Sequence, residues 1–248
     1  MKSDWFKDWF NTSEYLDVYK HRNEKDAESH IQLILNNVPV KFGADILDMA
    51  CGAGRHSIIL ARKNFNVTGV DLSGNLLSVA RETAEKENLK INFIQSDIRE
   101  YQTEKKFDLI LNLFTSFGYF ETDQENFSVL KKAYDFLKPN GYFILDYFNI
   151  EFLKNNLVEL SKDEIKDEQI IQRRKIENGR VVKQISILVD GKLREYEESV
   201  KMYSDIELVD ELRHIGFDIV KTFGDFLGSK FNKFESERLI LICKKLDS

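Results

Sequence analysis

A glycine-rich turn is the part of this sequence that most clearly suggests chemistry. Gly52 and Gly54 lie between an apolar run and a helical pattern. Glycine has no Cβ, so the backbone at these positions can approach a ligand closely. The start of the following helix adds unpaired N–H groups and the positive end of the helix dipole. The turn therefore predicts a ligand-binding loop.

The residues around the turn narrow the class of ligand. A phosphate-binding P-loop needs Gly-Lys-Ser/Thr, whereas Gly54 is followed by Arg55 and His56. A dinucleotide fingerprint has a third glycine where this chain has Ser57. Asp48, just before the turn, would repel a pyrophosphate but suits a cationic ligand, such as an amino group near a sulfonium. A nicotinamide-dependent oxidoreductase is thus disfavoured.

Two further acids end apolar runs. Asp71 closes the second run, where an ionised carboxylate can accept both hydroxyls of a ribose. Asp97 follows the third run and could accept from the exocyclic amine of an adenine. Each acid also has a structural alternative: Asp48 could hold loop backbone, Asp71 could cap the next helix and Asp97 could cap a short helix.

Strand and helix patterns alternate over the first 150 residues. Strands are predicted at 46–50, 67–71, 91–95, 107–112 and 142–147. Helices are predicted at 54–64, at 74–88 and after the capping box of Thr122 and Glu125, the last one ending at Lys138–Gly141. This order implies βαβ units, a parallel sheet covered on both faces, and the three acids at the carboxyl ends of strands.

The second half changes to extended runs. Residues 169–177, 181–189 and 192–203 are separated by Asn178-Gly179 and Asp190-Gly191, which predicts a three-stranded antiparallel meander. The meander either roofs a substrate pocket or forms a contact in a homodimer. A capping box at Ser204 then begins a helix that ends at Gly216, and closing strands follow near 217–224 and 237–244.

Bulk composition restricts the class of protein. The 248 residues, 42% hydrophobic and 31% charged, fit one α/β domain. A net charge of −6 disfavours a nucleic-acid partner, and neither a membrane span nor a signal peptide is predicted. Cys51 and Cys243 are isolated and the histidines lack ligand spacing, so we expect a cytoplasmic protein without a disulfide or a metal.

These residues resemble the class I S-adenosylmethionine-dependent methyltransferases of the small-molecule type. The resemblance covers residues 40–150 and is carried by several motifs in order along the chain. Residues 48–54 are similar to the first motif, 70–73 to the ribose-binding acidic motif, 96–98 to the adenine-binding motif, 107–112 to the fourth strand and 137–142 to the segment before the fifth.

The resemblance implies a doubly wound, mostly parallel seven-stranded sheet with an antiparallel last strand, and S-adenosyl-L-methionine as the cofactor. The turn at Gly52 would face methionine, Asp71 would bind ribose, and Asp97 and Ile98 would flank adenine, on which Leu72 would pack. Asn112 and Leu113 would offer backbone groups to methionine. The implied cofactor-binding residues are Asp48, Ala50, Gly52, Gly54, Asp71, Leu72, Asp97, Ile98, Asn112 and Leu113.

The loop at 112–119 indicates the kind of acceptor. It is similar to that of small-molecule methyltransferases and departs from the Asn/Asp-Pro-Pro-Tyr/Phe loop of enzymes that methylate nucleic-acid or glutamine nitrogens. We expect in-line methyl transfer to a small molecule. No general base is singled out: His56, Tyr119 and Tyr147 are candidates, each with an ordinary packing alternative. A protein of this fold that binds the cofactor without methylating is the other interpretation.

The N-terminal segment adds a possible cover for the cofactor. Trp5, Phe6, Trp9 and Phe10 have the spacing of one helix face, which could fold over the sulfonium or simply complete the core. We predict a single domain over 1–248, with a helical cap at 1–36, a cofactor-binding core at 37–150, a β insertion at 165–203, and a closing helix and hairpin at 204–248.

Overall fold

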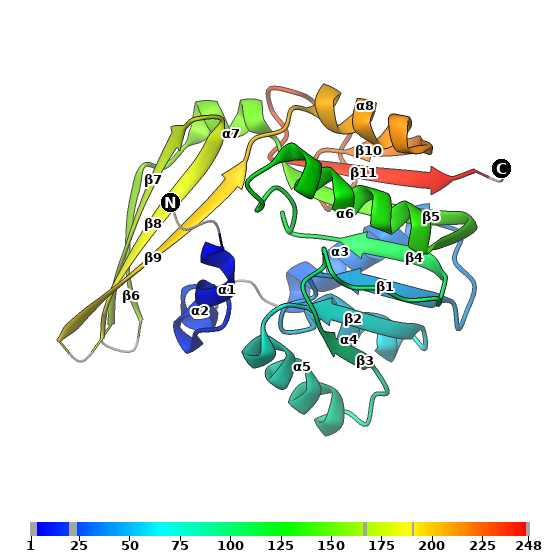
Figure 1. Cartoon of the computed structure of the whole chain (residues 1–248), viewed down its shortest axis with the longest axis horizontal. Coiled ribbons are helices and arrows are strands. Elements are labelled where there is room, and N and C mark those ends of the chain that lie inside the picture. Colours follow the sequence, from blue (N-terminus) through cyan, green and yellow to red (C-terminus); the bar gives the residue numbers. More distant parts are fainter. Residues whose placement is uncertain (1–3, 20–23, 166–167, 190, 247–248) are drawn as a thin grey trace.

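The computed structural model of the chain describes residues 4–19, 24–165, 168–189 and 191–246. The larger of its two sheets contains β1 (Asp45–Met49), β2 (Asn66–Asp71), β3 (Asn92–Gln95), β4 (Phe107–Asn112), β5 (Leu137–Phe148), β10 (Phe217–Phe223) and β11 (Arg238–Lys245). Their order is β10-β11-β5-β4-β1-β2-β3, and β11 runs antiparallel to both neighbours (Figure 1). The predicted doubly wound seven-stranded sheet is confirmed.

Helices cover both faces of this sheet. One face packs against α3 (Glu24–Asn37) and α4 (Arg55–Arg62), and α5 (Gly74–Lys86) lies beside α4. The other face packs against α6 (Asp123–Phe136) and α8 (Asp205–Ile215). Successive side chains of a strand point to opposite faces, so Ile46 joins the first layer and Leu47 the second. Burial on both faces explains why the central strands are continuously apolar.

Local signals placed the ends of several helices correctly. The hydroxyl of Thr122 accepts the N–H of Glu125 at 3.2 Å while the Glu125 carboxylate accepts the N–H of Thr122, as a capping box requires. Ser204 begins α8 in the same way, and Gly216 ends it with a φ of +116°. Strand β5 begins earlier than predicted, because an irregularity in its pairing with β4 accommodates the turn at Lys138–Gly141.

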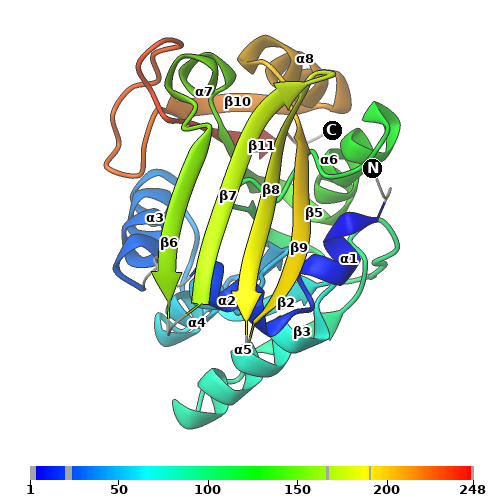
Figure 2. The ribbon, with the colours of Figure 1, turned by 90° about the vertical axis from the view of Figure 1, so that its left-hand side faces the viewer.

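The smaller sheet follows α7 (Ile150–Asn156) and has four antiparallel strands in the order β6-β7-β8-β9. They are β6 (Leu160–Ile165), β7 (Glu168–Glu177), β8 (Arg180–Val189) and β9 (Lys192–Lys201), drawn side by side in Figure 2. The prediction of three strands was wrong, because the four polar residues inside β6 hide its extended character. The turn at Asn178-Gly179 has positive φ at both residues, as predicted. Asp190 of the second predicted turn lies outside the described residues.

Two short helices, α1 (Trp5–Trp9) and α2 (Ser13–Val18), lie between the smaller sheet and the core in Figure 1. The aromatic residues whose spacing predicted one helix face contact two different parts of the protein. The ring of Trp9 packs on Tyr196 of β9 at 4.3 Å between centroids, whereas Phe6 lies 5.6 Å from Phe120 of the core. Helix α1 is therefore buried from two sides, with different aromatic residues serving each.

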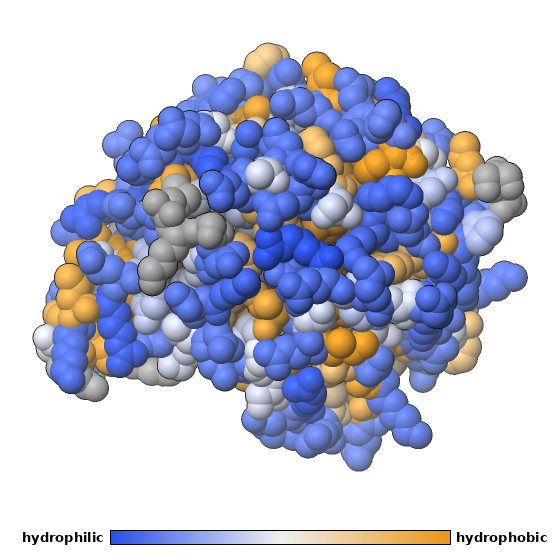
Figure 3. Space-filling model, viewed as in Figure 1, coloured by the Kyte–Doolittle hydropathy of each residue, from blue (hydrophilic) through white to orange (hydrophobic). Residues whose placement is uncertain are grey.

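Within the described ranges, no helix is both long and apolar enough to cross a bilayer. The face shown in Figure 3 is mostly hydrophilic, with apolar side chains in small separate groups.

Candidate functional site

The glycine turn has left-handed backbone at Ala50, Gly52 and Gly54, with φ of +58°, +55° and +76°. The two glycines differ in their surroundings. A Cβ on Gly54 would lie 2.9 Å from the Cβ of Ala80 in α5 and 3.0 Å from Cζ of Phe93 in β3. This glycine therefore allows the start of α4 to pack closely against α5 and β3. A Cβ on Gly52 would meet only a Leu76 methyl at 3.9 Å, so Gly52 faces open space.

Asp71 joins the turn to the next helix. One carboxylate oxygen accepts the N–H of Gly52 at 2.7 Å and the other accepts the N–H of Ser73 at 2.8 Å. Burial raises the pKa of Asp71, against the lowering effect of these N–H donors. Each oxygen keeps a second lone pair, so the carboxylate can hold the loop and still accept ligand hydroxyls.

Asp48 lies below the turn and is only 2% exposed. Its carboxylate accepts the hydroxyl hydrogen of Ser57 at 2.6 Å. Burial raises the pKa of Asp48 to about 7. The charge on this group consequently depends on pH near neutrality, and a cationic neighbour would favour its ionised form.

A first cavity lies on the Asp71 side of the turn, with a volume of about 90 Å³. Its core wall is formed by the ends of β1, β2 and β3, and its roof by α1 and the start of α2. The wall includes Ala50, Gly52, Asp71, Leu72, Asp97 and Ile98, and the roof includes Phe6, Phe10 and Tyr15. Polar and apolar groups thus meet where the resemblance placed ribose and adenine.

A second cavity of about 190 Å³ lies on the Asp48 side and shares Ala50, Gly52, Tyr15 and Tyr119 with the first. It is also lined by Asp48, Arg55, His56, Leu113, Phe114 and Tyr19. Both volumes are below the roughly 300–1,000 Å³ of ordinary ligand pockets, because aromatic side chains from the N-terminal helices fill the space.

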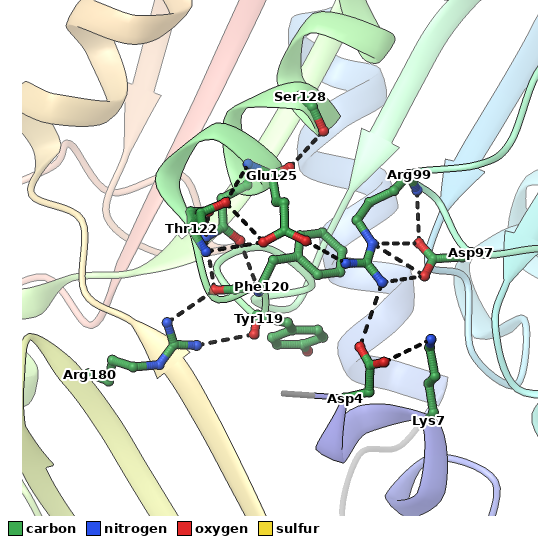
Figure 4. A network of polar contacts seen from close by, with 11 residues as sticks. Asp4, Lys7, Asp97, Arg99, Tyr119, Phe120, Thr122, Glu125, Ser128 and Arg180 are labelled. Carbon is green, nitrogen blue, oxygen red and sulfur yellow. Dashed lines mark hydrogen bonds and ion pairs between the residues drawn. The ribbon is translucent and has the colours of Figure 1, made fainter. Parts of the chain in front are cut away.

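Asp97 is held by its own neighbourhood. Its carboxylate accepts the backbone N–H of Arg99 at 2.9 Å and a guanidinium N–H of the same residue at 2.7 Å (Figure 4). Arg99 in turn pairs with Glu125 at 2.8 Å and stands 4.2 Å from the ring centroid of Phe120. Burial acts to raise the pKa of Asp97, but its bonds with Arg99 lower it overall. Asp97 therefore caps a turn at residues 98–100, at the edge of the first cavity, and not the short helix of its structural alternative.

The loop after β4 is strained and has a buried support that the sequence reasoning missed. Phe114 and Thr115 both have a φ of +61°, at a cost of about 1–3 kcal/mol each. The fully buried carboxylate of Asp146 accepts the N–H of Phe114 at 2.7 Å and a guanidinium N–H of Arg238 at 2.8 Å. A single acid inside the apolar run 143–147 was the available signal, since buried acids are seldom unpaired.

The three candidate bases occupy different environments. Tyr119 lines both cavities, and His56 lines the second. His56 is buried, its Nε2 lies 3.0 Å from Nδ1 of His30, and burial lowers its pKa well below the usual value. Tyr147 has no exposed surface and its hydroxyl donates to the carbonyl of Lys201, so the structure does not bring it to either cavity.

Asn112 and Leu113, the last two of the cofactor-binding residues that the resemblance implies, lie where β4 ends. Leu113 lines the second cavity, whereas Asn112 is not among its lining residues. The side-chain amide of Asn112 donates to the carbonyls of Ser116 at 3.3 Å and Met49 at 3.4 Å, which ties β4 to β1 at this edge.

Comparison with known proteins supports the family resemblance. Residues 46–141, which hold the turn and all three acids, match a family described as a methyltransferase domain. The resemblance to the class I S-adenosylmethionine-dependent methyltransferases is thus confirmed over these residues. An S-adenosylmethionine-dependent methyltransferase from Clostridium acetobutylicum ATCC 824, whose crystal structure is known, is 25% identical to this chain, with a TM-score of 0.79 over 94% of this chain and 97% of that chain.

Two curated relatives are similar over shorter stretches. A protein of Geobacillus sp. (strain WCH70) that is named as a methyltransferase is 29% identical over 140 residues, 55% of this chain and 57% of that protein. The ubiquinone biosynthesis O-methyltransferase of Rickettsia akari (strain Hartford) is 31% identical over 105 residues, 42% of this chain and 40% of the relative. The chain thus spans about half the length of the curated relatives it matches.

Proposed function

We propose that this methyltransferase transfers the methyl group of S-adenosylmethionine to a small-molecule acceptor by in-line displacement. One observation carries the proposal: two adjoining cavities flank the glycine turn, with Asp71 and Asp97 at one and Asp48 at the other. The bound cofactor would supply a methyl group on a sulfonium, which is already a good leaving group. The protein must then mainly align the reactants, which can contribute up to about 7–11 kcal/mol.

We assign the adenosine part of the cofactor to the first cavity. Asp71 would accept the ribose hydroxyls with the lone pairs that Gly52 and Ser73 leave available. Leu72 and Ile98 would pack against adenine, and Asp97 would lie at its edge. Gly52 would let the chain approach the ligand, because no Cβ projects into the space beside it.

We assign the methionine part to the second cavity. Asp48 would attract its amino group, and the Arg55 guanidinium would attract its carboxylate. The turn from Ala50 to Gly54, with the backbone of Asn112 and Leu113, would form the wall of this subsite. The opposite charges of Asp48 and Arg55 suit a zwitterionic amino acid, which a dinucleotide lacks.

The acceptor would enter beside Tyr15, Tyr19 and Tyr119, which close the second cavity. Two small cavities roofed by short helices favour a small-molecule acceptor over a nucleic acid. His56 is a weak base there because its pKa is lowered, and Tyr147 is assigned a packing role. Tyr119 is thus the remaining candidate among the three, and alignment would supply most of the acceleration.

We further propose that the helices over the cavities act as a lid that opens for the cofactor. The lid is residues 4–19, which include α1 and α2. Its aromatic side chains form the roof of both cavities, so closure would exclude water from the sulfonium. We also propose a cytoplasmic location, which two unpaired buried cysteines favour. A homodimer through the smaller sheet stays a prediction that light scattering can check.

The activity is tested with methyl-labelled S-adenosylmethionine and pools of small hydroxyl, amine, thiol and carbon acceptors. We expect label in one acceptor and one S-adenosylhomocysteine formed for each methyl transferred, with Asp71→Ala abolishing both. Binding of the cofactor without turnover on any pool would favour the non-methylating interpretation. Absence of binding would contradict the assignment of both cavities.

A further inference from the structure

A largely buried carboxylate in the smaller sheet contacts the lid. Glu198 of β9 accepts the indole N–H of Trp9 at 2.7 Å and the hydroxyl hydrogen of Tyr19 at 2.6 Å. Lys183 of β8 lies beside it, with its ammonium 3.0 Å from the carboxylate. The side chains of Glu198 and Lys183 are each only 14% exposed. One carboxylate thus holds one side chain from α1 and one from the end of α2.

The charge state of Glu198 suits this role. Burial acts to raise its pKa, but the Lys183 ammonium and the two bonds from the lid leave the pKa below its usual value. Glu198 is therefore ionised at neutral pH, and both of its bonds to the lid are charge-assisted. Lys183 also contacts Tyr19 directly, with its ammonium 4.4 Å from the centre of the tyrosine ring.

The lid depends on such contacts. Helices α1 and α2 have five and six residues, which is too short to be stable without packing. On the core side, the hydroxyl of Ser73 donates to the carbonyl of Phe10 at 2.7 Å, and Asn11 accepts the N–H of Asn75 at 3.2 Å. On the other side, the contacts of Glu198 are joined by an ion pair of Arg194 with Glu14.

The same residues that Glu198 holds lie next to the cofactor site. Tyr19 lines the second cavity itself, and Trp9 is followed directly by Phe10, which lines the first. Loss of the Glu198 contacts would remove one hold on each of the two helices and leave the Arg194–Glu14 ion pair and the Trp9–Tyr196 ring contact to the smaller sheet. The core contacts at Ser73 and Asn75 would then remain as a tether.

We infer that Glu198 is a positioning residue for the cofactor, which keeps the lid shut through Trp9 and Tyr19 so that the inserted sheet sets how long the cofactor stays bound. This inference rests on the proposed cofactor site. It gives the β insertion a function in cofactor retention in addition to any contact with the acceptor.

The test is the dissociation rate of S-adenosylhomocysteine from the full chain, followed by stopped-flow displacement. Glu198→Gln keeps the shape and removes the charge, and Glu195→Gln makes the same change at an exposed position of the same strand. We expect dissociation about 10-fold or more faster for Glu198→Gln, as for loss of a charged hydrogen bond, and an unchanged rate for Glu195→Gln.

A second variant separates positioning from folding. Tyr19→Phe removes only one hydroxyl, so it carries the test if Glu198→Gln does not fold. If the two residues act through one contact, the double variant should dissociate no faster than Glu198→Gln alone. A folded Glu198→Gln or Tyr19→Phe protein with the wild-type dissociation rate would overturn the inference. Failure of the wild type to bind S-adenosylhomocysteine would instead contradict the proposed function.

Discussion

The two glycines of the turn should respond differently to the same small change. Gly54→Ala puts a Cβ 2.9 Å from Ala80 and 3.0 Å from Phe93, at a φ of +76°. The left-handed backbone costs about 1–2 kcal/mol for alanine, and overpacking adds about 1–3 kcal/mol. The free energy of unfolding should fall by about 2–5 kcal/mol.

Gly52→Ala has the backbone cost without the clash. Its φ is +55° and its Cβ would meet only Leu76 at 3.9 Å, so we expect a loss of about 1–2 kcal/mol. For a chain of this size each kcal/mol lowers Tm by about 2–4 °C, so Gly54→Ala should lose about 4–20 °C and Gly52→Ala about 2–8 °C. The new methyl of Gly52→Ala would occupy the ligand side of the turn and weaken cofactor binding.

Both effects can be read in one assay, thermal unfolding with and without S-adenosylhomocysteine. Ligand at 100 times its Kd stabilises the wild type by about 2.7 kcal/mol. Gly54→Ala should have the lower Tm but keep most of the ligand-induced shift, whereas Gly52→Ala should lose most of the shift. The opposite ranking in Tm, or equal ligand shifts in the two variants, would refute the division of roles between these glycines.

Asp48, the Asp146–Arg238 pair and the lid give four further predictions. Burial raises the pKa of Asp48 to about 7, so its carboxylate becomes charged as the pH rises through 7. S-adenosylhomocysteine should therefore bind more tightly at pH 8 than at pH 6. Calorimetry of the Asp48→Asn variant should show the same affinity at both pH values. The same raised pKa means that Asp48 destabilises the cofactor-free protein as the pH rises from about 4 to 7, a slope that Asp48→Asn should remove from urea unfolding curves. Asp146→Asn leaves Arg238 without its carboxylate and should cost about 1–3 kcal/mol in urea unfolding; a change under 0.5 kcal/mol would show that the strained loop does not depend on this pair. Removal of residues 1–22 should weaken the binding of S-adenosylhomocysteine, measured by calorimetry, at least 10-fold. A truncated protein that folds and binds this ligand as before would contradict the proposal that residues 4–19 act as a lid.

Features encoded by neighbouring residues were predictable from the sequence. The turn between Asp48 and Gly54 and the capping box at Thr122 are each specified within a few positions, and the structure has both. The seven-stranded sheet followed from regular alternation of strands and helices together with the family resemblance. Continuously apolar runs predict the central strands well, because both faces of each central strand must be buried.

Features that depend on distant partners were not predictable in this way. Asp146 and Arg238 are 92 positions apart, and Trp9 and Glu198 are 189 apart, so no local pattern connects them. The spacing of the aromatic residues in the N-terminal segment indicated a buried helix, but not that both the smaller sheet and the core would bury it. Strand β6 was missed because pairing with β7, and not its own composition, makes it a strand.

The central claim is that the two cavities hold S-adenosylmethionine. Isothermal titration of the full chain with S-adenosylhomocysteine, and separately with NAD and NADP, tests it most directly. We predict one S-adenosylhomocysteine bound per chain, at least 10-fold weaker binding in Asp71→Ala, and no heat from either dinucleotide. Binding of NAD or NADP in place of S-adenosylhomocysteine would contradict the account.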